Sequence, residues 1–157
     1  RWPHYHYAEL AKQLIDEGFQ IVLFGSAKDH EAGNEILAAL NTEQQAWCRN
    51  LAGETQLEQA VILIAACKAV VSNDSGLMHV AAALDRPLVA LYGPSSPDFT
   101  PPLSHKARVI RLISGYHKVR KGDAAEGYHQ SLIDITPQRV LEELNDLLLE
   151  KTEQEED

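Results

Sequence analysis

The sequence has few cysteines, a deficit of positive charge and no long hydrophobic run. Its two cysteines, Cys48 and Cys67, form no CxxC pair and are too few for a disulfide framework, which favours a protein of the reducing cytoplasm. The 14 Lys and Arg residues against 23 Asp and Glu give a formal net charge of −9. This charge excludes a general nucleic-acid binder, which needs a basic face. No apolar run approaches the length of a membrane span.

The signatures of several enzyme classes are also missing. Without a GxGxxG or Walker A sequence, a dinucleotide oxidoreductase and a P-loop kinase gain no support. No nucleophile elbow or matched pair of carboxylates stands out, and the histidines are too scattered for a structural zinc site. The chain opens with Arg1-Trp2-Pro3, without a signal peptide or an initiator Met. We therefore expect a piece of a longer protein whose chemistry-defining groups lie elsewhere.

What the sequence does have is a regular alternation of short apolar runs and amphipathic segments. Helical spacing predicts helices over residues 5–17, 28–40, 57–66 and 76–84, and Thr136-Pro137 opens a last one. Short β-rich runs predict buried strands over residues 20–24, 49–51, 68–72, 87–91 and 108–113. The alternation predicts an α/β fold, a three-layer α/β/α Rossmann-like parallel sheet with helices on both faces.

Length and composition predict the domain organisation. A chain of 157 residues with 45% hydrophobic residues is long enough for one domain with a real core, which we place over residues 1–149. The polar stretch over residues 114–131 is predicted to be irregular. The acidic end, residues 150–157, is predicted to be a disordered tail.

The most informative feature is the turn between the strand at 68–72 and the helix at 76–84. It reads Asn73-Asp74-Ser75-Gly76, with His79 one helical turn further on. The N-terminus of a helix presents backbone N–H groups and a positive dipole end, and ligands bind at the carboxyl ends of parallel strands. We therefore expect phosphates at Ser75, Gly76 and His79 and a sugar hydroxyl at Asp74. An ordinary capped turn fits the spacing equally well.

Two further turns would lie at the same edge of the sheet. Gly53-Glu54-Thr55-Gln56 precedes a helix and could contact a base or ribose, although a plain helix cap explains its spacing better. The turn at residues 25–31 carries acids, among them Asp29, that would bind ribose hydroxyls or simply begin a helix. The basic cluster at residues 117–121 could meet acceptor phosphates or an anionic membrane, but a solvated loop is the more common explanation.

Three stretches carry a family resemblance: Asn73-Asp74-Ser75-Gly76-Leu77-Met78-His79 with the Ala-rich helix after it, Arg86-Pro87, and Tyr92-Gly93-Pro94-Ser95. Together with the opening Arg1-Trp2-Pro3, they closely resemble the heptosyltransferases of lipopolysaccharide core assembly (glycosyltransferase family 9). The match spans residues 1–149, and the D-[ST]-G-x-x-H turn is fairly specific to that family. The chain resembles most the members that add the second heptose.

The resemblance implies the C-terminal, ADP-heptose-binding half of an inverting GT-B glycosyltransferase that needs no divalent metal. Asp74 would lie near the heptose and the pyrophosphate, Ser75, Gly76 and His79 near the phosphates, and Thr55 beside the adenine. An acid at residues 29–31, for which we take Asp29, would bind the ribose.

The catalytic group and the acceptor site are expected outside this chain. The general base and the pocket for the lipopolysaccharide core would belong to a missing N-terminal domain, so this chain alone is predicted to be inactive. We expect it in the cytoplasm, with a peripheral contact at the inner membrane. The alternatives are a non-catalytic nucleotide-binding module of the same fold and a nucleotide-sugar epimerase, although the epimerase would need a dinucleotide fingerprint or a paired base.

Overall fold

The computed structural model describes residues 2–73, 76–92, 107–111, 124–125 and 128–156. The chain divides into two compact units. One comprises residues 3–60, and the other combines the N-terminal Trp2 with the described residues from Val61 onwards. Each unit contains parallel strands and helices, so the α/β class predicted from the sequence is confirmed. A single domain over residues 1–149 stays a prediction.

The unit of residues 3–60 is built around two parallel strands. Strand β1 (Ile21–Leu23) pairs with β2 (Cys48–Asn50), with Ile21 opposite Cys48. The helices are α1 (His4–Asp16), the 3₁₀ helix η1 (Ala27–Asp29), α2 (His30–Ala39) and α3 (Thr42–Gln45), and α4 (Leu57–Ala65) begins here. Apolar side chains from these elements form one cluster: Ala11, Ile15, Ile21, Leu23, Leu37, Leu40 and Cys48.

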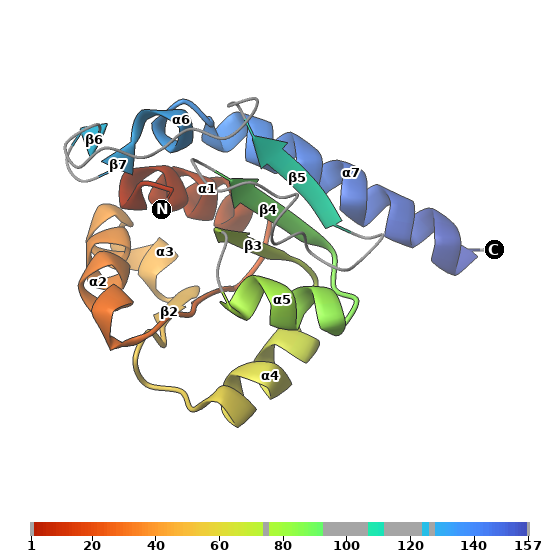
Figure 1. The fold of residues 1–157 in the computed structure, drawn as a ribbon, viewed down its shortest axis with the longest axis horizontal. Helices are drawn as coiled ribbons and strands as arrows, with labels where there is room; N and C mark the ends of the chain where they lie inside the picture. Colours follow the sequence, from red (N-terminus) through yellow and green to blue (C-terminus); the bar gives the residue numbers. More distant parts are fainter. Residues whose placement is uncertain (1, 74–75, 93–106, 112–123, 126–127, 157) are drawn as a thin grey trace. The chain divides into compact units, whose positions relative to one another are not determined.

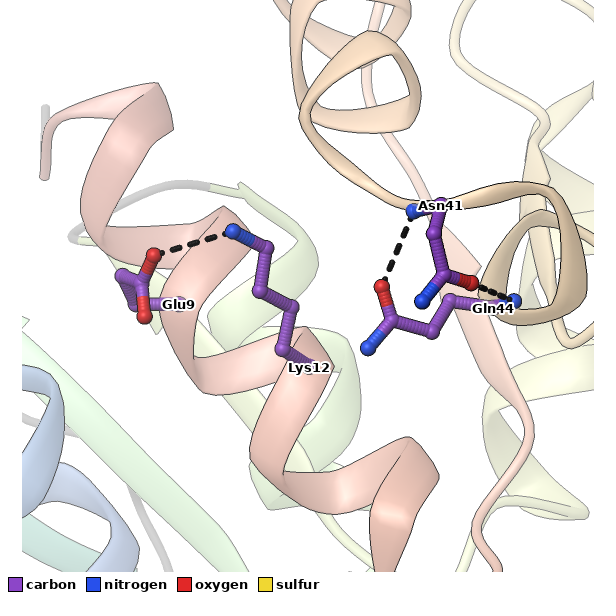
Figure 2. A network of polar contacts seen from close by, with 4 residues as sticks. All are labelled: Glu9, Lys12, Asn41 and Gln44. Atoms are coloured by element: carbon purple, nitrogen blue, oxygen red, sulfur yellow. Dashed lines mark hydrogen bonds and ion pairs between the residues drawn. The ribbon is translucent and has the colours of Figure 1, made fainter.

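Two polar contacts at the surface of this unit, a capping box and an ion pair, involve helices α3 and α1 (Figure 2). Asn41 accepts a hydrogen bond from the Gln44 backbone at 2.8 Å, and the Gln44 side chain accepts one from the Asn41 backbone at 2.9 Å. This capping box explains why α3 begins at Thr42. Lys12 and Glu9 on α1 form an exposed ion pair at 3.1 Å. Exposed pairs of this kind add little stability, so the apolar cluster holds the unit together.

The second unit contains a three-stranded parallel sheet in the order β3 (Val70–Asn73), β4 (Leu88–Tyr92) and β5 (Ala107–Arg111). Four successive β4 residues, Leu88, Val89, Ala90 and Leu91, are at most 1% exposed. Because alternate strand residues point to opposite faces, both faces of β4 must be covered. Helix α5 (Gly76–Ala83) and helix α7 (Pro137–Glu156) both contact β4 and lie on opposite sides of the sheet (Figure 1).

The structure adds elements where the sequence analysis expected none. A short antiparallel pair, β6 (Ala124–Ala125) with β7 (Tyr128–His129), and helix α6 (Gln130–Ile133) lie mostly within the stretch predicted to be irregular. Helix α7 continues to Glu156 and so includes nearly all of the predicted disordered tail. Its apolar stripe ends with Leu147 and Leu148, and the acidic residues beyond simply prolong the helix with good helix formers.

Helix α1 ends in a turn that requires glycine. Gly18 has a φ of +96°, its N–H donates to the Ile15 carbonyl at 2.9 Å, and the Phe19 N–H donates to the Leu14 carbonyl at 3.0 Å. These two bonds are the Schellman arrangement, in which the residue after the helix takes a left-handed conformation.

We expect Gly18→Ala to lower the free energy of unfolding by about 1 kcal/mol, because an alanine Cβ disfavours left-handed backbone. A Cβ at Gly18 meets no described atom within 4 Å, so the whole effect comes from the backbone. Urea titration measures it, with Glu17→Ala as the control, since Glu17 is an exposed neighbour with a right-handed φ of −84°. Equal urea concentrations at the midpoint of unfolding for the two variants would contradict the prediction.

Candidate functional site

Helix α5 begins at the predicted residue, whereas the strand before it ends one residue later than predicted, so that Asn73 belongs to β3 and not to the turn. Strand β3 ends at Asn73 and α5 begins at Gly76, while Asp74 and Ser75 lie outside the described residues. Met78 is fully buried and anchors the first turn of α5, whereas Gly76 and His79 are exposed. A Cβ built on Gly76 meets no described atom within 4 Å, so none of the described residues covers the backbone at the start of the helix.

The end of β3 is held in place by Trp2. The backbone N–H of Trp2 donates to the Asn73 side-chain oxygen at 3.0 Å, and the indole N–H donates to the Ile135 carbonyl at 2.8 Å. The Trp2 side chain is 1% exposed. The N-terminal segment therefore ties the residue just before the candidate turn to the chain that leads into α7. No pattern in the sequence around Trp2 predicts this contact.

The turn after β1 contains Asp29 as a helix-capping residue. Its carboxylate accepts hydrogen bonds from the Ser26 backbone N–H at 2.8 Å and from the Ser26 hydroxyl at 3.1 Å. Gly25 makes room for it, since a Cβ there would lie 2.6 Å from the Asp29 carboxylate oxygen. This is the structural role that the sequence left open for the acids of this turn. The binding of a ribose by half-exposed Asp29 stays a prediction.

The turn after β2 lies against the turn after β1. Gly53, with a φ of +77°, donates its N–H to the Gly25 carbonyl at 2.9 Å, and a Cβ on Gly53 would lie 2.9 Å from the Ala27 Cα. Half-exposed Thr55 follows two residues later, just before α4. The structure therefore joins the turns that carry Asp29 and Thr55, both within the unit of residues 3–60. Gly76 and His79 belong to the other unit.

The two cysteines offer no nucleophile. Burial raises the pKa of the Cys48 thiol to about 11. Burial also raises the pKa of Cys67, an effect that the neighbouring Arg86 guanidinium partly opposes. Both thiols are therefore protonated at neutral pH, and a protonated thiol is a poor nucleophile and metal ligand.

The described part of the chain contains no group of three or more His, Cys, Asp or Glu side chains arranged to hold a metal ion. None of its helices is both long and apolar enough to cross a membrane. The basic cluster at 117–121 lies outside the described residues.

Comparison with known proteins places the chain in a family. The model of glycosyltransferase family 9 (heptosyltransferase) matches residues 1–129. The chain belongs to this family. It is 93% identical over 151 residues to lipopolysaccharide heptosyltransferase 2 of Escherichia coli, which covers 96% of this chain and 43% of that protein.

Solved structures of family 9 enzymes have the same fold. The structure of the E. coli ADP-heptose lipopolysaccharide heptosyltransferase II matches with a TM-score of 0.89 and 86% identity, over 97% of this chain and 43% of that one. The E. coli heptosyltransferase WaaC with ADP-2-deoxy-2-fluoro heptose matches with a TM-score of 0.68 and 28% identity, over 93% of this chain and 38% of that one. The chain thus spans less than half the length of these family 9 relatives.

Proposed function

We propose that this chain is the ADP-heptose-binding domain of an inverting heptosyltransferase that adds the second heptose to the inner core of lipopolysaccharide. The observation that carries the proposal is the match of nearly the whole chain to a solved ADP-heptose lipopolysaccharide heptosyltransferase. The exposed helix start at Gly76 supports it independently, because an open helix N-terminus at the carboxyl end of a parallel strand suits a pyrophosphate.

In the proposed reaction, an acceptor heptose hydroxyl attacks the anomeric carbon of the donor. The bond from this carbon to the ADP oxygen breaks, the configuration inverts, and the hydroxyl proton passes to a general base outside this chain. Negative charge grows on the pyrophosphate as ADP leaves. Backbone N–H groups in the first turn of α5 stabilise that charge without having to reorganise, and such fixed donors are commonly the largest contribution to catalysis.

The remaining donor contacts follow the family pattern. Asp74 and Ser75 bind around the heptose and the phosphates, and His79, in the first half of α5, contacts the phosphates. Thr55 contacts the adenine and Asp29 the ribose. The joined turns after β1 and β2 support this pairing, because a nucleoside needs its base and its sugar bound a fixed distance apart.

The acceptor and the cellular location belong to the same proposal. The lipopolysaccharide core binds to the part of the enzyme beyond this chain, and the enzyme works in the cytoplasm at the inner face of the membrane. The basic cluster at 117–121 suits an anionic surface or the phosphates of the acceptor. Because the base lies elsewhere, this chain alone transfers no heptose.

Calorimetry of the full-length protein with ADP tests the proposal, with UDP and GDP as controls. We expect selective ADP binding, weakened by Asp74→Ala and by Ser75→Ala in a folded protein. NMR shift mapping on this chain should then place the changes at Thr55 and at residues 74–79. Equal affinity for all three nucleotides would contradict the proposal. ADP binding without heptose transfer by the full-length protein would instead indicate a non-catalytic nucleotide-binding module.

A further inference from the structure

Asn50, the last residue of β2, uses its side-chain amide to join two segments of the unit of residues 3–60. The amide nitrogen donates to the His30 carbonyl at 3.0 Å and to the Asn34 side-chain oxygen at 3.1 Å. The amide oxygen accepts from the Ala52 N–H at 3.1 Å. Both amide hydrogens and one oxygen lone pair are thus used. The partners are the start of α2 on one side and the turn after β2 on the other.

Gly33 provides the space in which this amide lies. A Cβ built on Gly33 would overlap the Asn50 side-chain amide, at 2.5 Å from two of its atoms. Gly33 is buried in α2, where glycine is otherwise unfavourable by about 1 kcal/mol relative to alanine. The close approach of α2 to the end of β2 therefore depends on a matched pair, a glycine on the helix and an amide on the strand.

A second set of contacts strengthens the same junction, which is the region where the start of α2 and the turn after β2 meet. The His30 ring nitrogen Nδ1 lies 3.1 Å from the Ala52 carbonyl oxygen. Because a carbonyl only accepts, Nδ1 must carry the proton in this hydrogen bond. The Gly53 N–H completes the junction through the Gly25 carbonyl. Asp29 directly precedes His30, and Thr55 is three residues beyond Ala52. Both residues proposed to bind the nucleoside of the sugar-nucleotide donor therefore lie next to residues that make these contacts.

We propose that Asn50 is a positioning residue for the nucleoside end of the donor. It holds the turn of Asp29 and the turn of Thr55 in one arrangement, so that ribose and adenine are bound together without the cost of ordering two loops. Asn50 itself touches no part of the donor. The inference rests on the proposed function and deepens it, because it names the residue that keeps the two nucleoside-binding turns in register.

The test compares Asn50→Ala with Asn41→Ala in the full-length enzyme. Asn41 also bonds a backbone N–H in this unit, but its bond caps helix α3 and does not join the turns that carry Asp29 and Thr55. For Asn50→Ala we expect the ADP dissociation constant and the KM for the donor sugar nucleotide to rise about tenfold, the effect of losing roughly one well-placed hydrogen bond. The inhibition constant of inorganic pyrophosphate and the KM for the acceptor should stay unchanged. Asn41→Ala should change none of these constants.

A purely structural role predicts a different result. If Asn50→Ala binds ADP as tightly as the wild type, or loses ADP and pyrophosphate to the same extent, the proposal is overturned. Should Asn50→Ala fail to fold, Asn34→Ala removes a single bond at an exposed residue and should raise the ADP dissociation constant about two- to threefold. An unchanged constant in that variant overturns the proposal too. A wild-type enzyme that does not bind ADP would instead contradict the proposed function itself.

Discussion

Replacing Trp2 by alanine is expected to lower the free energy of unfolding by about 4 kcal/mol, among the largest effects of a single substitution. The indole is 1% exposed, and its N–H donates to the Ile135 carbonyl at 2.8 Å. Truncation removes a large apolar surface, leaves a cavity and deprives that carbonyl of its partner. Trp2→Phe separates these causes, because it keeps most of the apolar volume and should cost about 1–2 kcal/mol.

The matched control is the same substitution at the other tryptophan. Trp47 is 44% exposed, so Trp47→Ala should change the free energy of unfolding by less than about 1 kcal/mol. Urea titration followed by far-ultraviolet circular dichroism compares the variants without relying on tryptophan fluorescence. A loss for Trp2→Ala no larger than that for Trp47→Ala would show that the N-terminal segment does not anchor the unit that contains β3.

The regular elements with strong apolar patterns could be predicted from the sequence. The helix expected over residues 5–17 is α1 at 4–16, and the strand expected over residues 87–91 is β4 at 88–92. In both cases local periodicity and burial agree, so the pattern alone determines the element. Helix α3 was missed because four residues carry no apolar stripe, although Asn41 and Gln44 have the spacing of a capping box.

The residues that support the candidate site could not be predicted in the same way. The Trp2 side chain meets Ile135, 133 residues away, and no local pattern encodes a contact of that separation. Asn50 gave no signal either, because a polar residue at the end of a strand is typical of any turn. The turns at Gly25 and Gly53 were visible in the sequence, but the close approach between them was not. That approach depends on the room that Gly25, Gly33 and Gly53 leave for their neighbours.

The start of α5 allows a test that separates binding from folding. Gly76→Val should raise the dissociation constant for ADP by about 100-fold in the full-length enzyme, comparable to losing a preorganised donor to the phosphates. The reason is steric, since a side chain at this position occupies the space through which a pyrophosphate must approach the helix N–H groups. The protein itself should tolerate the change, because a Cβ on Gly76 meets no described atom within 4 Å and its φ is not left-handed.

Two comparisons make this result interpretable. Gly76→Ala carries a smaller group and should give an intermediate loss, so the three residues at this position form a graded series. Ala83→Val adds the same β-branched side chain at the exposed last residue of α5 and should leave ADP affinity unchanged. If Gly76→Val binds ADP like the wild type, the pyrophosphate does not lie at this helix start. If Ala83→Val loses affinity equally, the loss comes from a disturbed helix, because the two sites lie at opposite ends of α5.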